Sequence, residues 1–231
     1  MKLNIYISTC NKYLDLLKPF SFLFNRFWDK TQEVTILGYK KPKFGLPDNF
    51  KFVSFGNDDN VHKWSTDLRK FFSGITDEYF IYGLEDYFLK KVNTDIIDRL
   101  ITYIEADGKI GRVQLGSGLR THKGGSRYKN VVNDKHLMVI EAPQTVKYRV
   151  STQFSIWRKE YMLKYLLPGQ TPWEFEMKSS QSAKNDGYRI IGTRGSEYAV
   201  EYSIAKRKNE SGIKLSFDKS IIKEMKGQNI I

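Results

Sequence analysis

The sequence predicts a single α/β domain built on a mixed, mostly parallel central sheet that is flanked by helices. Three observations support this prediction. Segments typical of strands and of helices alternate through the first hundred residues, hydrophobic residues make up 40% of the chain, and no apolar run is long enough to cross a membrane. A chain of 231 residues can bury one large core. We expect one continuous domain with halves over residues 1–108 and 109–205, followed by a tail over 206–231.

The first half reads as strands and helices in turn. A buried strand is expected to end in the polar turn Ser8–Asn11, and the apolar residues that follow recur at helical spacing. Pro19 either kinks that helix or opens a second segment. The expected elements, in order, are a strand over 3–8, a helix over 13–27, strands over 33–39 and 52–55, a helix over 61–72, a central strand over 78–84 and a helix over 94–104.

The second half has shorter apolar segments and more turn residues. A strand pair over 136–141 and 146–157 is expected to form a hairpin around Pro143. The remaining expected elements are a strand over 109–115, a helix over 159–167, a helix opening at Thr171-Pro172, and two short strands within 188–203. Alternation of strands and helices favours a parallel sheet, and ligands of such sheets bind beyond the carboxyl ends of the strands.

Charge and cysteine content restrict the compartment and the partners. A single cysteine, Cys10, fits a reducing compartment, and with neither a signal peptide nor a membrane span in sight we expect a cytoplasmic protein. The net charge of +12 predicts a polyanionic partner. Basic residues are spread along the chain without a known nucleic-acid motif, so we expect no specific nucleic acid. A phosphorylated donor, an acidic glycan, or peripheral contact with an anionic membrane would suit the charge equally well.

Two adjacent carboxylates, Glu85 and Asp86, follow the best central-strand candidate. Neighbouring carboxylates repel each other, so they are poor contributors to stability, and a divalent cation bridging to a diphosphate would relieve the repulsion. The alternative is a solvated turn or a helix cap. The strand before them should end at the same sheet edge as the turn Ser8–Asn11, which makes a shared ligand site the favoured interpretation.

The segment Leu84-Glu85-Asp86-Tyr87-Phe88-Leu89 resembles the acidic motif of GT-A-fold glycosyltransferases, in particular the Leu-Glu-Asp-Asp form of N-acetylglucosaminyltransferases. The opening Ile7-Ser8-Thr9-Cys10-Asn11 is similar to the nucleotide-binding start of that fold, and the helix around Trp64 resembles its approach to the acidic motif. The resemblance spans about the first hundred residues.

The resemblance implies a GT-A-like fold and a nucleotide-sugar donor. It implies donor contacts by Ser8, Thr9, Asn11, Trp64, Glu85 and Asp86, with Mn2+ or Mg2+ held by Asp86. The sequence departs from the motif at Tyr87, where the family form has the aspartate that ligates metal most directly. Metal use therefore stays open at this point.

The segment Thr171-Pro172-Trp173-Glu174-Phe175-Glu176 opens a helix. Thr171 and Glu174 form a capping box, which gives Glu174 a structural role. An aromatic face beside carboxylates also suits a sugar acceptor and a base. The segment looks like the helix start that carries the catalytic base of inverting GT-A enzymes. The resemblance thus implies Trp173 beside a glycan or lipid-linked acceptor and either Glu174 or Glu176 as base.

Two rival functions come from other classes. Glu176-Met177-Lys178 matches the Glu-x-Lys half of a metal-dependent nuclease, which places this tripeptide on a strand, so a helix at 172–180 would argue against it. A non-enzymatic glycan-binding module would explain the charge and the aromatic residues but leaves Glu85 and Asp86 without a role. A basic loop with Arg120, His122, Lys123 and Arg127 is either a solvated surface loop or a cover for a diphosphate.

Overall fold

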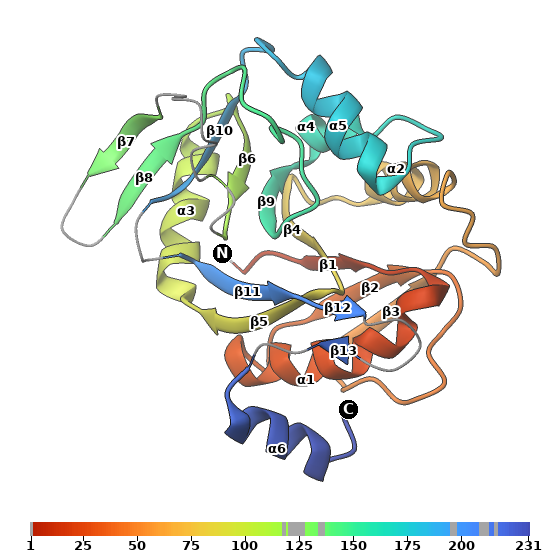
Figure 1. Ribbon diagram of the computed structural model, residues 1–231. Helices are drawn as coiled ribbons and strands as arrows, with labels where there is room; N and C mark the ends of the chain where they lie inside the picture. Colours follow the sequence, from red (N-terminus) through yellow and green to blue (C-terminus); the bar gives the residue numbers. More distant parts are fainter. Residues whose placement is uncertain are drawn as a thin grey trace.

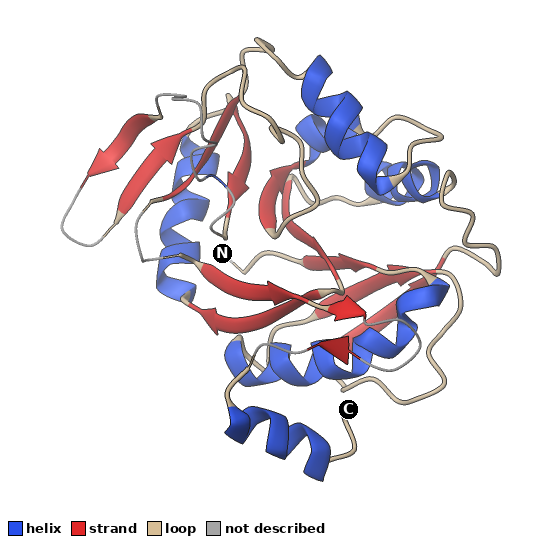
Figure 2. Ribbon diagram, viewed as in Figure 1, coloured by secondary structure: helices blue, strands red, loops and turns tan. Residues whose placement is uncertain are grey.

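The computed structural model describes residues 2–116, 119, 128–133, 137–194, 198–207, 213–214 and 217–231. The basic loop with Arg120, His122, Lys123 and Arg127 lies outside these residues. The described chain forms a central nine-stranded sheet. Helices cover both faces of this sheet (Figure 2). This confirms the predicted mixed α/β class.

The central sheet is mixed, and seven of its nine strands run in one direction. Strands β3, β2, β1 and β4 are parallel neighbours, while β9 and β8 run against the rest. The strands, in their order across the sheet, are β3 (Phe50–Ser54), β2 (Val34–Gly38), β1 (Ile5–Ser8), β4 (Tyr79–Leu84), β9 (Ser155–Arg158), β6 (Ile110–Gln114), β10 (Arg189–Thr193), β8 (Met138–Glu141) and β7 (Lys129–Asn133).

Two small antiparallel pairs lie outside this sheet. One joins β5 (Tyr87–Val92) to β11 (Val200–Ile204), and the other joins β12 (Lys206–Arg207) to β13 (Ile213–Lys214). Strand β5 follows Glu85 and Asp86 directly and was not predicted. The pair β5–β11 therefore turns the chain away from the main sheet at the acidic turn.

The helices divide between two cores because successive strand residues point to opposite faces. Ile5 and Ile7 of β1 join the core under α1 and α3, whereas Tyr6 joins the core under α2, α4 and α5. Figure 1 shows α2, α4 and α5 grouped together and α6 beside α1. The helices are η1 (Asn11–Leu16, a 3-10 helix), α1 (Leu17–Phe27), α2 (Trp64–Gly74), α3 (Thr94–Ala106), α4 (Lys159–Tyr165), α5 (Pro172–Ser182) and α6 (Lys219–Gly227).

Pro19 lies in the first turn of α1, directly after the 3-10 helix, so it opens a second segment as one of the two alternatives predicted. The tail contains α6, whose Ile221 and Met225 are buried. Arg26 of α1 also pairs with Glu224 of α6. None of the helices in the described part of the chain is both long and apolar enough to cross a bilayer.

The expected hairpin around Pro143 is wrong. Strand β8 pairs with β7 and β10, and only the last three residues of the second expected strand, 155–157, are in a sheet, as part of β9. Residues 142–154 run as an irregular segment between β8 and β9. The buried Arg149 side chain bonds to the carbonyl oxygens of Pro143, Ala183 and Tyr188, so side-chain donors replace a strand ladder here.

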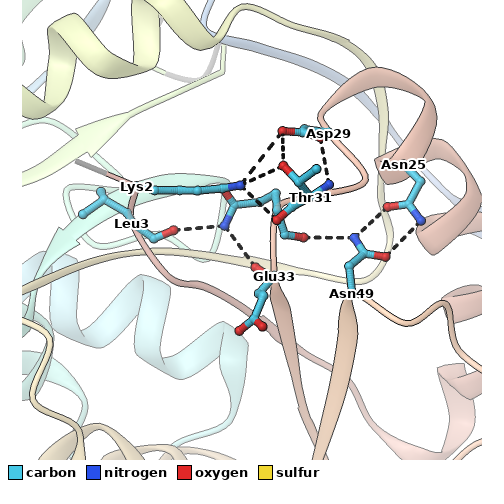
Figure 3. A network of polar contacts seen from close by, with 8 residues as sticks. Lys2, Leu3, Asn25, Asp29, Thr31, Glu33 and Asn49 are labelled. Carbon is cyan, nitrogen blue, oxygen red and sulfur yellow. Dashed lines mark hydrogen bonds and ion pairs between the residues drawn. The ribbon is translucent and has the colours of Figure 1, made fainter.

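A polar network fixes the amino ends of the first strands (Figure 3). The buried Gln32 amide donates to the carbonyl oxygens of Leu3 and Glu33, and Asn49 donates to the Gln32 carbonyl oxygen at 2.9 Å. The Asn25 and Asn49 amides donate to each other at 3.1 and 2.8 Å. Because these bonds fix how β1, β2 and β3 start, they also fix where the carboxyl ends of these strands meet.

Candidate functional site

A cleft of about 460 Å³ lies at the carboxyl ends of β1 and β4. Its walls come from the turn after β1, the segment before α2, the acidic turn after β4 and the start of α5. The lining residues are Ser8, Thr9, Cys10, Lys12, Tyr13, Tyr39, Asp59, Asn60, Val61, Trp64, Leu84, Glu85, Asp86 and Pro172. The two polar turns expected at one sheet edge thus share one cleft, because β1 and β4 are parallel neighbours that end together.

The turn after β1 supplies a buried polar wall. Ser8 and Thr9 are both buried, and the Trp64 indole donates to Ser8 Oγ at 3.0 Å. This bond joins the first residue of α2 to the end of β1. The arrangement holds a flat aromatic ring and a hydroxyl in fixed positions beside the cleft, as in small-molecule sites in general.

Asn11 lies beside the cleft and is absent from its lining residues. Its backbone N–H donates to Asp59 Oδ2 at 3.0 Å, and its side-chain oxygen accepts from the Lys40 backbone N–H at 2.9 Å. Both groups therefore hold neighbouring loops. Asn11 therefore supports the cleft indirectly, by holding Asp59, which lines it. Its contact with a nucleotide-sugar donor stays a prediction.

Asp86 is the exceptional carboxylate of the cleft. Its Oδ1 atom is buried and has no hydrogen-bond partner in the described part of the chain. Burial raises the pKa of Asp86 to about 6, and the charge of Glu176 adds a smaller push in the same direction. A buried anionic oxygen without a partner is costly, so this atom is suited to a cation or a donor proton from a ligand.

The residues present fit one divalent cation held by a single protein carboxylate. Within the described chain, no three His, Cys, Asp or Glu side chains gather in a set that could hold a metal ion. Burial raises the pKa of Tyr87 well above its usual value, so this phenol stays neutral and does not replace the aspartate of the family motif. Among the carboxylates that line the cleft, Asp86 carries the buried unpartnered oxygen that suits such an ion, and further oxygens would have to come from a ligand or water.

The Glu174 side chain forms part of the cap at the start of α5. Thr171 Oγ1 accepts from the Glu174 backbone N–H at 3.2 Å, and Glu174 Oε2 accepts from the Thr171 backbone N–H at 2.9 Å, which completes the predicted capping box. Lys178 donates to its other oxygen at 2.7 Å. The Lys178 and Thr171 bonds lower the pKa of Glu174 to about 2. A carboxylate so committed is a poor proton acceptor.

Glu176 points away from Glu174, and neither side chain is among the residues that line the cleft. Its Oε1 atom accepts from Ser151 Oγ at 2.9 Å, from the Thr152 N–H at 2.7 Å and from Thr152 Oγ1 at 2.9 Å. Its charge contributes to the raised pKa of Asp86 and of Tyr82, so it shares the electrostatic environment of the acidic turn. Residues two apart on a helix lie on different faces, which explains why Glu174 and Glu176 separate.

Trp173 is 68% exposed, and its neighbour Pro172 lines the cleft. Residues 172–182 are helical, so the tripeptide Glu176-Met177-Lys178 lies on a helix and lacks the strand that a nuclease core requires. Sequence reasoning missed Tyr39 and Asp59, which come from loops, and Lys12, which comes from the 3-10 helix η1; the sequence does not reveal the place of these segments in space. Asp59 lies in the acidic, Asn-rich stretch after β3, which was available as a signal.

Comparisons with known proteins bear on the fold. No protein-family model matches the sequence, and no curated protein matches it. TarS 1-349 of S. aureus, in complex with UDP-GlcNAc, has a TM-score of 0.52 and 15% identity over 91% of this chain. The mannosyltransferase PcManGT of Pyrobaculum calidifontis, in complex with GDP-Man and Mn2+, has a TM-score of 0.49 and 12% identity over 82%. A cytidylyltransferase of Leptospira borgpetersenii has a TM-score of 0.48 and 9% identity over 86%.

The chain spans 60% of the TarS chain, 53% of the mannosyltransferase chain and 78% of the cytidylyltransferase chain. At these identities the likeness concerns the fold alone. Together with the sheet order and the flanking helices, the likeness to TarS shows that the chain has a GT-A-like fold.

Proposed function

We propose that this chain is a glycosyltransferase that moves a sugar from a nucleoside diphosphate sugar to a hydroxyl group of a glycan or lipid-linked acceptor. The observation that carries the proposal is the meeting of the Ser8–Asn11 turn and the Glu85–Asp86 turn at one cleft, with a buried unpartnered oxygen on Asp86. The GT-A-like fold supports it, and TarS of that fold binds UDP-GlcNAc. The donor would lie between the two turns, with its diphosphate at Asp86.

A divalent cation, Mn2+ or Mg2+, would be held by Asp86 and would neutralise charge on the departing diphosphate. The chain's own residues have three further tasks. Ser8, Thr9 and Trp64 bind the nucleoside, Glu85 flanks the donor, and Asn11 holds the wall through Asp59. The burial of Ser8 and Thr9, the Trp64–Ser8 bond and the Asn11–Asp59 bond support these assignments.

Glu176 is the proposed general base. It lies in the electrostatic environment of Asp86, and the hydrogen bonds from Ser151 and Thr152 reach only its Oε1 atom. Both oxygens of Glu174 are bound, one in the helix cap and the other by Lys178. In an inverting transfer, Glu176 takes the proton of the acceptor hydroxyl as that oxygen bonds to the anomeric carbon. The bond between this carbon and the diphosphate oxygen breaks, and the nucleoside diphosphate leaves with its electron pair. Trp173, exposed next to the cleft wall, would stack on the acceptor.

A thermal unfolding screen with UDP-, GDP- and CDP-sugars, each with and without Mn2+, tests the donor assignment. A ligand at a hundred times its dissociation constant adds about 2.7 kcal/mol to the stability, which corresponds to a rise in Tm of roughly 5–10 °C for a chain of this size. We expect at least one donor to produce this rise and Asp86→Asn to remove it. A chain that responds to none of them would contradict the proposal.

A further inference from the structure

The irregular segment 148–155 holds Glu176 in place. Three of the donors to Glu176 Oε1 come from Ser151 and Thr152, at 2.7–2.9 Å, and both residues are buried. The same segment is attached to α5 at a second point, where Ser180 Oγ accepts from the Val150 N–H at 3.0 Å and donates to the Val150 carbonyl oxygen at 2.9 Å. The direction of the Glu176 carboxylate therefore depends on the conformation of this segment.

Arg112 of β6 binds the segment from within the core. Its Nη2 donates to the Tyr148 carbonyl oxygen at 3.1 Å, and its Nη1 donates to the Ser151 carbonyl oxygen at 3.4 Å and to Ser155 Oγ at 3.3 Å. The side chain is almost fully buried, and its Nε atom has no partner among the described residues. The guanidinium thus spans both ends of the segment that carries the donors to Glu176.

The partners of this guanidinium are unusual for a buried arginine. The other fully buried arginine, Arg149, has an ion pair with Asp186 at 3.0 Å, whereas no carboxylate in the described chain lies within ion-pair distance of Arg112. Burial lowers the pKa of Arg112 to about 10, and the charge of Glu176 acts in the opposite direction. An apolar side chain of similar size would avoid the desolvation cost, so stability alone does not account for an arginine at this position.

We propose that Arg112 is a positioning residue for Glu176: by fixing segment 148–155 it aims the Ser151 and Thr152 donors, and through them the carboxylate, at the acceptor hydroxyl. The proposal rests on the proposed function, in which Glu176 is the base. It assigns Arg112 no contact with the donor, because Arg112 lies outside the cleft lining.

The test compares Arg112→Met with Ser179→Ala, measuring turnover as release of nucleoside diphosphate from the donor. Ser179→Ala is the matched control, because it removes two buried hydrogen bonds of α5 to Gln170 and Tyr165, outside segment 148–155, and leaves the Arg112 and Glu176 bonds intact. We expect Arg112→Met to lower kcat at least thirtyfold with the donor KM within threefold, and Ser179→Ala to change both by less than threefold. Equal effects of the two variants, or a loss through KM alone, would overturn the proposal.

A second variant and a double-mutant cycle test the same proposal without relying on the activity of Arg112→Met. Thr152→Val removes one donor to Glu176 without touching Arg112, and should lower kcat about tenfold at unchanged KM, whether or not Arg112→Met folds. A double-mutant cycle of Arg112→Met and Glu176→Gln, followed by urea unfolding, needs no activity. We expect the unfolding constant of the double variant to differ at least tenfold from the product of the single effects. If the two single effects on the unfolding constant simply multiply, Arg112 and Glu176 are not coupled and the positioning role is refuted. A chain that binds no donor would instead refute the proposed function.

Discussion

Replacing Asp86 by asparagine should stabilise the protein at neutral pH while it removes turnover. The folded state raises the pKa of Asp86 from 3.8 to about 6. Because the folded chain then holds its proton more tightly than the unfolded chain, stability falls as the pH rises through this interval. A shift of about two pKa units corresponds to a penalty of about 3 kcal/mol at pH 7.5 and less than about 1 kcal/mol at pH 4. Asparagine cannot ionise and avoids the penalty.

The assay is urea unfolding of wild type and Asp86→Asn at both pH values in the presence of EDTA. We expect the variant to be more stable by about 3 kcal/mol at pH 7.5 and nearly equal to wild type at pH 4. Such a gain with loss of function is the usual sign of a site that is strained for its ligand. Two results would refute the argument that the buried Asp86 carboxylate lacks a stabilising partner. One is a variant less stable than wild type at pH 7.5, and the other is the same change in the free energy of unfolding at both pH values.

Three further predictions test separate parts of the structure. Glu176→Gln should lower turnover at least a hundredfold, as expected for loss of a general base, whereas Glu174→Gln should retain most of it; steady-state rates distinguish the two. Gly111→Ala places a Cβ 2.4 Å from an aromatic ring carbon and should cost at least about 1–3 kcal/mol in urea unfolding, while Gly108→Ala, with nothing within 4 Å, should have little effect. Asp186→Asn leaves a buried guanidinium without its anion and should cost about 3–5 kcal/mol; a cost below 1 kcal/mol would contradict this view of the pair.

The first half of the fold could be predicted because its strands and helices differ in hydrophobic period. Strands β1, β2 and β4 and helices α2 and α3 all appear where the sequence pattern placed them, within a few residues. Parallel pairing then determines that the turns after β1 and β4 meet, which is why Ser8 and Asp86 could be assigned to one site. The capping box at Thr171 was visible for the same reason: its residues are close in sequence.

The second half depends on contacts that sequence spacing does not encode. Arginines are rarely buried, so nothing in the sequence marks Arg112 and Arg149 as the side chains that hold segment 148–155. Their bonds to carbonyl oxygens replace the ladder of the expected hairpin. The different hydrogen bonding of Glu174 and Glu176 could not be predicted either, because Glu176 is held by Ser151 and Thr152, more than twenty positions away in the chain.

The most direct test of the donor site is a crystal structure of the protein with a nucleoside diphosphate sugar and Mn2+. We expect the diphosphate between the turn after β1 and the acidic turn after β4, with the cation bound to Asp86 and the nucleoside against Trp64. A donor bound elsewhere, with the Asp86 carboxylate still unpartnered, would contradict the central claim.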